Sequence, residues 1–292
     1  MKTIELATLP INQRQQYMQH AIGPRPICFA STIDKDGNVN LSPFSFFNMF
    51  STNPPVVVFS PSSRVRDNTQ KHTLENVLEV PEVVINIVDF DMVQQVSLSS
   101  VEYPKGINEF IKAGFTEEPA TMVKPPMVKE SKVKMECKVR EVKRLGEQAG
   151  AGNLVICEVL MMHIDESILD DSGMIDQRKF KLVARLGGDY YCSVNEDNLF
   201  IVPKPNRKMG IGIDMLPENV RNSKVLTGND LGMLGNVEEI PLIDPAYENE
   251  DLKKIVQYYS LNPDDMEREI HLLAQQLLKE RKVAEAWQVL LS

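Results

Sequence analysis

Two arginines stand close together in a segment that is rich in hydroxyl groups. Arg64 and Arg66 lie within Ser60–Thr69, which follows a β-branched run at 56–59 and precedes a predicted helix. A loop at this place presents hydroxyls, two guanidinium groups and the free backbone amides of a helix N-terminus to one point. These are the donors that a phosphate dianion requires, and arginine offers them in bidentate geometry. A solvent-exposed loop with an ordinary helix cap would carry the same residues, so both interpretations stand.

A second segment alternates small polar groups with aromatic rings. It runs from Asn40 to Phe50 and places Ser45 and Asn48 among phenylalanines. A strand of this kind could set backbone amides and these two side chains along the polar edge of a flat heteroaromatic ring. Aromatic residues in strands more often pack against other strands. Each phenylalanine is therefore first expected in the core.

Motifs of several common enzyme classes are missing from the sequence. There is no GxGxxG after a strand, no GxxxxGK[ST], no HExxH and no GxSxG. The four histidines, His20, His72, His163 and His271, show no metal-ligand spacing, and we predict no metal site. His163 falls in a strand pattern, where a structural role is the first expectation. If the chain is an enzyme, a bound cofactor therefore carries the chemistry and the protein positions it.

The composition limits the kind of protein this can be. The chain has 292 residues, 42% of them hydrophobic and 25% charged, as in an average globular protein and unlike a disordered or coiled-coil chain. Its net charge of −9 makes nucleic acid and anionic lipid poor partners, so a bound anion needs a local cluster of donors. The four cysteines show no CxxC spacing and predict reduced, buried thiols. No apolar run has the length of a signal peptide or a membrane span, so we expect a cytoplasmic protein without a membrane partner.

The elements that must position these side chains are mainly strands. Apolar alternation and turn residues predict strands at 27–34, 39–50, 56–59, 83–88, 132–144 and 153–164. Short helices are predicted at 91–99 and after Asp67 or Asn68, either of which could act as the N-cap. Strands grouped in this way, without regular alternation of strand and helix, indicate an α+β barrel rather than a doubly wound sheet.

The composition changes near Pro203-Lys204-Pro205, and we predict one domain at 1–202 and a mostly helical extension at 203–292. In the extension, Asp244-Pro245 and Asn262-Pro263 each place a capping side chain before a proline at a first helical position. The second pair predicts a single helix of about 28 residues. An apolar stripe along this helix is expected to pack on the main domain or on a partner subunit. The stripe consists of Met266, Ile270, Leu273, Leu277, Ala284, Trp287 and Leu291.

Several of these pieces, taken in order, resemble the flavin reductase-like family, whose members include flavoredoxin and are FMN-binding split barrels. The resemblance covers about residues 20–194. It rests on Arg25-Pro26-Ile27 to Thr32, Leu41 to Asn48, Asn53-Pro54-Pro55, Ser60-Pro61, Arg64 to Thr69, Val84 to Val88, Glu102 to Gly106, Glu109-Phe110, Val183 to Gly188 and Tyr190-Tyr191. One piece alone is a weak signal, whereas the ordered set is specific.

The resemblance implies an α+β fold that is mainly β: an FMN-binding split β-barrel with short helices and a helical C-terminal extension. It also implies a homodimer with one FMN per subunit near the interface. The residues at 60–69 resemble ligands of the phosphate and ribityl chain, those at 44–48 a wall along the flavin ring, and those at 99–103 a segment that covers it. The implied cofactor-binding residues are Phe44, Ser45, Phe46, Phe47, Asn48, Ser60, Arg64, Arg66, Asp67, Asn68, Thr69, Ser99, Ser100 and Tyr103. Arg185 and Tyr190 are the implied substrate-binding residues, on the open side of the flavin.

The implied activity is hydride transfer from NAD(P)H to the flavin, and then passage of reducing equivalents to a free flavin or a redox protein. Such transfer mainly needs stacked, closely held reactants, which fits the absence of an acid–base pair. A non-catalytic FMN-binding electron carrier of flavoredoxin type needs the same contacts and stays an alternative. Another ligand such as haem is a third, although no histidine offers an obvious axial ligand. FAD in place of FMN also stays open, as does the choice between NADH and NADPH.

Overall fold

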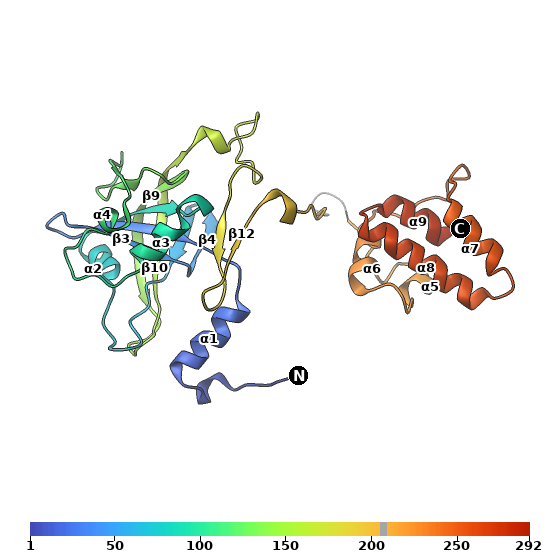
Figure 1. Cartoon of the computed structure of the whole chain (residues 1–292), viewed down its shortest axis with the longest axis horizontal. Coiled ribbons are helices and arrows are strands. Elements are labelled where there is room, and N and C mark those ends of the chain that lie inside the picture. Colours follow the sequence, from blue (N-terminus) through green and yellow to red (C-terminus); the bar gives the residue numbers. More distant parts are fainter. Residues whose placement is uncertain (205–208) are drawn as a thin grey trace. The chain divides into compact units, whose positions relative to one another are not determined.

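The chain folds into two compact units, and each has a hydrophobic core of its own. The computed structural model describes residues 1–204 and 209–292, so Pro205, part of the predicted composition change, lies outside the described residues. The first unit is Met1–Phe200 and the second is Ile201–Ser292 (Figure 1). The first is built around strands, whereas the described part of the second is built from helices.

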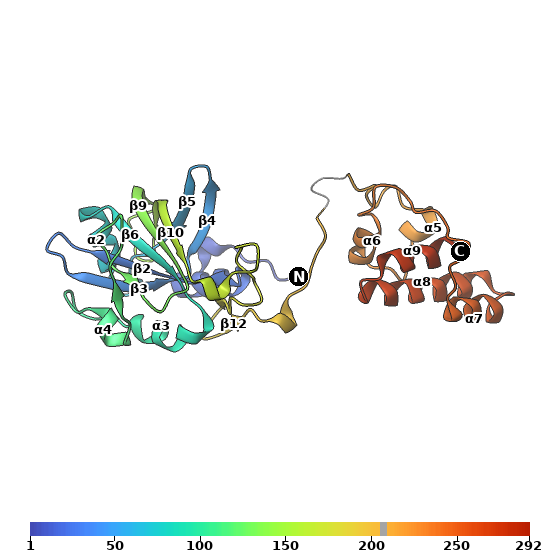
Figure 2. The same cartoon turned by 90° about the horizontal axis from the view of Figure 1, so that it is seen from above.

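The largest element of the first unit is a seven-stranded sheet (Figures 1 and 2). Its strands follow one another in the order β3-β2-β6-β9-β10-β5-β4. Their bounds are Cys28–Ile33 for β2, Val39–Phe44 for β3, Phe47–Thr52 for β4, Pro55–Phe59 for β5, Glu82–Ile87 for β6, Val133–Arg144 for β9 and Asn153–Ile164 for β10. Every pairing in this sheet is antiparallel, whereas a doubly wound sheet is mostly parallel. The predicted α+β class is therefore confirmed.

A very short connection joins the two ends of this sheet. β3 and β4 are its edge strands, yet only Ser45 and Phe46 separate them in the sequence. Such a link spans about 10 Å at most, whereas the edges of a flat seven-stranded sheet would lie about 29 Å apart. The sheet is therefore rolled into a barrel. The prediction of one strand at 39–50 is wrong, because the chain crosses here from one edge of the sheet to the other.

The two longest strands, β9 and β10, follow from the alternation of apolar and charged residues. Cys137 and Val139 are buried on β9, as a period of two predicts. The strands predicted at 132–144 and 153–164 are thereby confirmed. Glu136 departs from the pattern, since this charged residue is fully buried.

Buried thiols contribute to the main core of the first unit. Cys28, Cys137 and Cys157 are buried as predicted, whereas Cys192 is only half-buried. Burial raises the pKa of the Cys137 thiol to about 12, so this group behaves as a small apolar side chain. The other buried members of this core are Ala30, Phe44, Val57, Phe59, Leu74, Val77, Val83, Ile85, Val139 and Val155.

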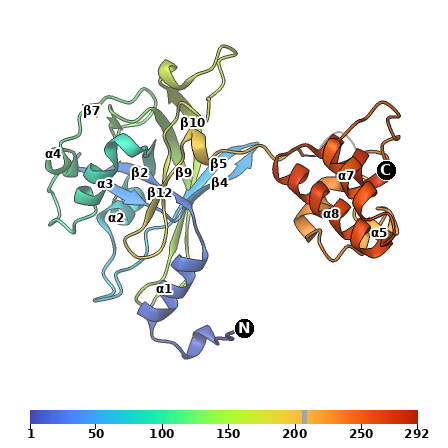
Figure 3. The same cartoon turned by 45° about the vertical axis from the view of Figure 1, so that its right-hand side comes forward.

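Shorter elements surround the barrel. The strand predicted at 83–88 is confirmed as β6. The helix predicted at 91–99 is confirmed as a short 3₁₀ helix that continues into α3. α3 and α4 lie next to each other beside β3 (Figure 3). The helices of this unit are α1 (Ile11–Ala21), α2 (His72–Glu79), α3 (Val93–Ser99) and α4 (Glu109–Ala113). The short strands are β1 (Arg25–Pro26), β7 (Glu117–Glu118), β8 (Met127–Val128), β11 (Val183–Arg185) and β12 (Tyr191–Ser193).

The second unit, called the helical unit below, is a small bundle. Its helices are α5 (Glu218–Arg221), α6 (Gly228–Leu234), α7 (Glu250–Tyr258), α8 (Pro263–Lys279) and α9 (Val283–Leu291). Asn262 caps α8 through a hydrogen bond from the Asp265 amide, with Pro263 at the first helical position, so that predicted start is confirmed. No helix in the described parts of the chain combines the length and the apolar character that crossing a membrane requires.

Two predictions about the helical unit are wrong. The expected single long helix is broken after Lys279, where Arg281 adopts a φ of 63° and turns the chain into α9. Asp244-Pro245 does not start a helix, because α7 begins at Glu250 with Asn249 as its cap. Most of the apolar stripe joins a core formed by the unit's own helices, around Trp287. Beyond the break the helical phase changes, and so Ala284, expected in the stripe, is exposed.

Candidate functional site

The loop Ser60–Thr69 folds into a compact turn between β5 and α2. The Arg64 amide donates to the Thr69 carbonyl (2.9 Å), and the Asn68 amide donates to the Arg64 carbonyl (2.9 Å). Asn68 closes the turn with a φ of 58°, a left-handed conformation that asparagine tolerates better than most residues. The loop therefore has a fixed shape.

The prediction that Asp67 or Asn68 caps the following helix is wrong. The Asp67 carboxylate instead accepts from the Thr69 amide (3.0 Å) and hydroxyl (2.6 Å), inside the turn. These hydrogen bonds, together with the Arg66 guanidinium, hold the pKa of Asp67 well below its usual range. α2 begins only at His72, without a side-chain cap.

The loop that joins β9 to β10 supports this turn. The Ser63 amide donates to the Ala151 carbonyl (2.9 Å), and the Gly150 amide donates back to the Ser63 carbonyl (3.2 Å). Asn68 Nδ2 donates to the Glu147 carbonyl (3.0 Å). Two loops that are distant in the sequence thus fix each other's shape.

Arg64 is held more firmly than Arg66. Its Nη1 donates to Thr69 Oγ1 (2.9 Å) and to the Gln70 carbonyl (2.6 Å), and its Nε donates to Glu102 Oε1 (2.8 Å). The side chain is 16% exposed, against 75% for Arg66. Arg64 therefore presents a positive charge in a fixed position, whereas the Arg66 side chain extends into solvent.

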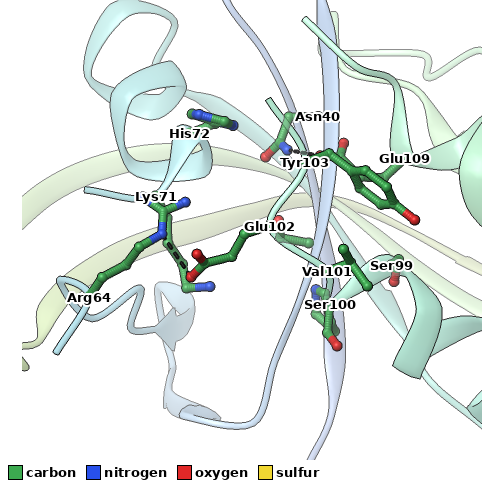
Figure 4. Close-up of a pocket in the computed structure, with 12 residues that line it drawn as sticks. Asn40, Arg64, Lys71, His72, Ser99, Ser100, Val101, Glu102, Tyr103 and Glu109 are labelled. Atoms are coloured by element: carbon green, nitrogen blue, oxygen red, sulfur yellow. Dashed lines mark hydrogen bonds and ion pairs between the residues drawn. The ribbon is translucent and has the colours of Figure 1, made fainter. Parts of the chain in front are cut away.

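A pocket lies where this loop meets the segment after α3. Residues 100–106 of that segment are called the strap here, and the pocket is called the strap pocket. It has a volume of about 40 Å³, and its side chains come from β3, the loop, the start of α2, the strap and α4 (Figure 4). The lining residues are Asn40, Ser42, Pro43, Arg64, Lys71, His72, Ser99, Ser100, Val101, Glu102, Tyr103 and Glu109.

The structure brings four of the predicted site residues together in the strap pocket. They are Arg64 from the loop, Ser99 from the end of α3, and Ser100 and Tyr103 from the strap. The remaining predicted residues do not line it: Phe44, Ser45, Phe46, Phe47, Asn48, Ser60, Arg66, Asp67, Asn68, Thr69, Arg185 and Tyr190. Arg66 still reaches the strap, because its Nη2 donates to Glu102 Oε2 (3.3 Å).

The aromatic segment 44–48 divides between the core and the surface. Phe44 packs 5.1 Å from the ring of Phe59, and Phe47 packs against the same core, as expected of aromatic residues in strands. Phe46, in the crossing between β3 and β4, and Asn48, on β4, are exposed. Any contact of this segment with a ligand would therefore come from its exposed members and its backbone.

The predicted site residues leave out eight residues that line the pocket: Asn40, Ser42, Pro43, Lys71, His72, Val101, Glu102 and Glu109. Lys71 and His72 directly follow the predicted phosphate loop, so extending that loop to the true helix start would have included them. Asn40 and Glu109 carried no such signal, since their contact depends on how α4 packs on β3.

The charges around Glu102 lie close enough to shift one another's pKa. Burial raises the pKa of Glu102, but Arg64, Arg66 and Lys71 together bring it below its usual value. Burial lowers the pKa of Lys71 and the charge of Arg64 lowers it further, whereas Glu102 acts in the opposite direction. Three cations thus surround one strap carboxylate.

A chain of buried polar side chains crosses β3 at the pocket. Thr73 Oγ1 donates to Asn40 Oδ1 (2.8 Å), and Asn40 Nδ2 donates to Glu109 Oε1 (3.0 Å). The Leu41 amide donates to Glu109 Oε2 (3.0 Å). Burial raises the pKa of Glu109 above its usual value, although these hydrogen bonds oppose the shift. The chain ties α2, β3 and α4 together and fixes one wall of the pocket.

Arg185 and Tyr190 lie elsewhere, in and beside the small sheet β1-β11-β12. Arg185 donates to the Tyr191 hydroxyl and to the Gly188 carbonyl (2.6 Å), and its guanidinium lies 4.5 Å from the centre of the Tyr191 ring. The Tyr190 side chain is largely exposed. The two predicted substrate contacts are therefore neighbours of each other but not part of the strap pocket.

A second polar group, called the Glu136 cluster here, joins β9 and β10. The buried Glu136 carboxylate accepts from the amides of Thr121 (2.9 Å), Met122 (2.5 Å) and Val123 (3.1 Å), and His163 Nε2 shares a hydrogen bond with its Oε1 (2.7 Å). Burial raises the pKa of Glu136, but these hydrogen bonds bring it below its usual value. A cavity of about 240 Å³ adjoins His163, lined also by Glu118, Met127, Lys129, Ser131, Lys132, Lys134, Ile164 and Asp165. Within residues 1–204 and 209–292, no group of three or more His, Cys, Asp or Glu side chains is placed to hold a metal ion.

Known proteins identify the family of the barrel. The sequence profile of the flavin reductase-like domain matches residues 20–183, more than half of the chain. The chain belongs to the flavin reductase-like family. A relative in Aquifex aeolicus, itself uncharacterised, is 40% identical over 168 residues, which are 58% of this chain and 83% of that protein. The helical unit lies outside the family match.

Solved structures of similar proteins share the barrel. Nitrilotriacetate monooxygenase component B from Bacillus cereus is 27% identical, with a TM-score of 0.65 over 69% of this chain and 98% of that one. A split-barrel protein of flavin reductase type from Shewanella frigidimarina NCIMB 400 is 28% identical, with a TM-score of 0.58 over 68% of this chain and 96% of that one. The predicted split-barrel fold is confirmed.

The cations of the strap pocket suit an anionic group such as a phosphate. Arg64 and Lys71 supply positive charge, and a guanidinium pairs with phosphate oxygens in bidentate geometry. The hydroxyls of Ser99 and Ser100 already donate to carbonyls of α3 (3.0 and 2.6 Å), so the fit rests on the two cations. The pocket is smaller than the roughly 300–1,000 Å³ of a whole small-molecule site. The ring of a bound flavin would therefore extend beyond it.

Proposed function

We propose that the chain is a flavoenzyme that binds FMN and transfers a hydride from NAD(P)H to it. The observation that carries this proposal is the firmly held Arg64 guanidinium beside Lys71 in the strap pocket. Membership of the flavin reductase-like family supports it, because the phosphate of FMN is a group that these two cations could bind. The proposed cofactor-binding residues are those predicted from the sequence, with Lys71 added.

The side chains of the pocket have separate tasks in this proposal. A bound flavin would supply the chemistry, accepting and donating a hydride. Arg64 would hold the phosphate while Thr69 and the Gln70 carbonyl keep the guanidinium in place. The buried chain from Thr73 through Asn40 to Glu109 would keep the pocket wall rigid. Such positioning is the main contribution a protein makes to transfer between stacked rings.

The reductant and the electron acceptor are part of the same proposal. Arg185 offers a cation stacked on the Tyr191 ring, and Tyr190 offers an exposed ring, features that suit a nicotinamide or a second flavin. The acceptor would be a free flavin or a redox protein, and the likeness to a monooxygenase component B supports a partner of this kind. We also propose a homodimer, in which a partner subunit completes the surface around the flavin ring.

The division of labour between the two units is a further part of the proposal. Residues 1–202 would form the flavin-binding domain and residues 203–292 a separate helical domain. The two compact units, each with its own core, support this division. The strap pocket is lined by residues of the first unit alone.

The experiment that tests the proposal follows the visible spectrum of the purified full-length chain with added FMN. We expect one FMN per chain, and we expect NADH or NADPH to bleach the flavin band under argon. The Arg64→Ala variant, tested alongside, should bind FMN more weakly.

Failure to bind flavin would contradict the proposal, and a haem spectrum would point to another ligand class. Flavin binding without bleaching by either nucleotide would favour an electron carrier over an enzyme.

A further inference from the structure

A side chain of the strap occupies the position in which the strap pocket would bind an anion. Glu102 Oε1 accepts from Arg64 Nε (2.8 Å), while Glu102 Oε2 accepts from Arg66 Nη2 (3.3 Å). Figure 4 shows Glu102 reaching toward Arg64, with Lys71 on the same side of the pocket. One carboxylate thus bridges two guanidinium groups, as two oxygens of a phosphate would.

Displacing Glu102 is possible because the strap is tied down lightly. The Glu102 side chain is 43% exposed, so it can turn into water without leaving a buried charge. Further along the strap, an ion pair joins the Lys105 ammonium to Glu75 (3.3 Å), and both side chains are well exposed. Exposed pairs of this kind contribute little to stability.

We propose that Glu102 is a resident counter-ion that a ligand phosphate must displace, and that it thereby lowers the affinity of this site for phosphorylated flavins. This rests on the proposed function, because it concerns the same site. Glu102 carries one negative charge and a phosphate ester close to two at neutral pH. A phosphate dianion therefore gains more from Arg64 and Lys71 than the carboxylate it replaces. A flavin without a phosphate has no anionic group that could replace Glu102 beside these cations.

The test compares the affinities of FMN and riboflavin for the full chain and two variants, by flavin fluorescence at low salt. In Glu102→Gln the competing charge is gone, and we expect FMN to bind about tenfold more tightly, the effect of one charge-assisted contact. Riboflavin affinity should not change. Glu75→Gln is the matched control, since it makes the same change of charge and frees the same strap without touching Arg64 or Arg66. It should leave both affinities unchanged.

Two results would overturn the proposal. Unchanged or weaker FMN binding by Glu102→Gln would mean that Glu102 orients the arginines instead of competing with the ligand. An equal increase in the affinities for FMN and riboflavin would mean that a more loosely held strap, rather than the removal of the Glu102 charge, is responsible.

Inorganic phosphate separates this proposal from the proposed function. Its stabilisation of the chain in a thermal melt should be larger in Glu102→Gln than in the original sequence, whether or not flavin binds. If FMN fails to bind while this difference appears, the proposed function is wrong and the counter-ion role stands. If phosphate stabilises both proteins equally, the counter-ion role is wrong.

Discussion

The strap pocket and the Glu136 cluster both gather charged groups from distant parts of the sequence, yet they use charge in opposite ways. In the Glu136 cluster, a fully buried carboxylate is surrounded by three backbone amides and His163. In the strap pocket, three cations share the half-exposed Glu102. Enclosed charge with complete hydrogen bonding stabilises a fold, whereas partly exposed charge in excess is available to a ligand.

Two buried glutamates show the same contrast in their acidity. Glu136 has a lowered pKa, because hydrogen bonds to its ionised form outweigh its burial. Glu109 lines the strap pocket and has a raised pKa, because burial outweighs the hydrogen bonds from the Leu41 and Glu109 amides and the Asn40 side chain. Burial alone therefore does not decide the ionisation of a carboxylate in this barrel, because hydrogen bonds to the ionised form oppose it.

The contrast is tested most strongly at Glu136. Replacing it with alanine leaves three amides and His163 without their acceptor, and we expect the free energy of unfolding of the barrel to fall by about 3 kcal/mol or more. Urea denaturation followed by far-ultraviolet circular dichroism measures this loss. A loss well under about 1 kcal/mol would be less than the cost of one buried, unsatisfied polar group. It would show that the cluster does not stabilise the barrel.

The two glutamates should also respond to pH in opposite directions. The folded-state pKa of Glu136 is depressed, so its contribution is fully present above the unfolded value of about 4.3 and is lost as pH falls through the folded pKa. The pKa of Glu109 is raised, so its contribution is greatest below that value and is lost as pH rises.

Unfolding of the Glu136→Gln and Glu109→Gln variants in urea, at neutral pH and near pH 4, measures this. As pH falls, the advantage of the original sequence should shrink over Glu136→Gln and grow over Glu109→Gln. Parallel changes would contradict the assignment of opposite shifts.

For the strap pocket, the largest effect is expected from Arg64→Ala. The loss of a charged group that is held in place by Thr69 and Gln70 should weaken FMN binding by about 1.5–3 kcal/mol, the range for hydrogen bonds to charged groups. Titration of flavin fluorescence measures the affinity. Arg140→Ala is the control, because Arg140 pairs with Glu158 on β10 and does not line the pocket. An equal loss in both variants would place the phosphate elsewhere.

A smaller effect is expected from His163→Gln. This change weakens one hydrogen bond to Glu136 and should lower the free energy of unfolding by about 1 kcal/mol, with FMN affinity and flavin reduction unchanged. Urea denaturation and flavin titration on the same sample check both halves. A large loss of flavin reduction at unchanged stability would overturn the structural role of His163.

The smallest effect is expected from Arg66→Ala. Arg66 is largely exposed and already paired with Asp67 (2.9 Å), so a phosphate gains little from it. We expect FMN affinity to fall less than about fivefold, the scale of an exposed ion pair. Titration beside Arg64→Ala decides whether the two arginines, which the sequence alone weighted equally, differ as their burial indicates.

The strands and the polar loop at 60–69 could be predicted from the sequence, because both depend on local patterns. The alternation along β9 and the polar run at 60–69 are visible in consecutive residues. The crossing at Ser45 and Phe46 was not, since it depends on the sheet closing upon itself. The break between α8 and α9 was missed because Arg281 takes a left-handed conformation with neither glycine nor proline to mark it.

The pocket was predicted only in part for the same reason. The sequence pointed to Arg64, which lines the pocket, but its partner Glu102 lies 38 residues further along the chain. The link from Asn40 to Glu109 spans 69 residues. Pairings of this length are determined by how elements pack, and no local pattern encodes them.

The mutual support between the loop after β5 and the loop joining β9 to β10 has a consequence for engineering. The hydrogen bonds between Ser63, Gly150 and Ala151 transmit the shape of one loop to the other. Insertions or randomised residues in the second loop would alter how rigidly Arg64 is presented without changing any ligand-binding side chain. If Arg64 holds a flavin phosphate as proposed, a variant library confined to that tip would give proteins that release the flavin at different rates.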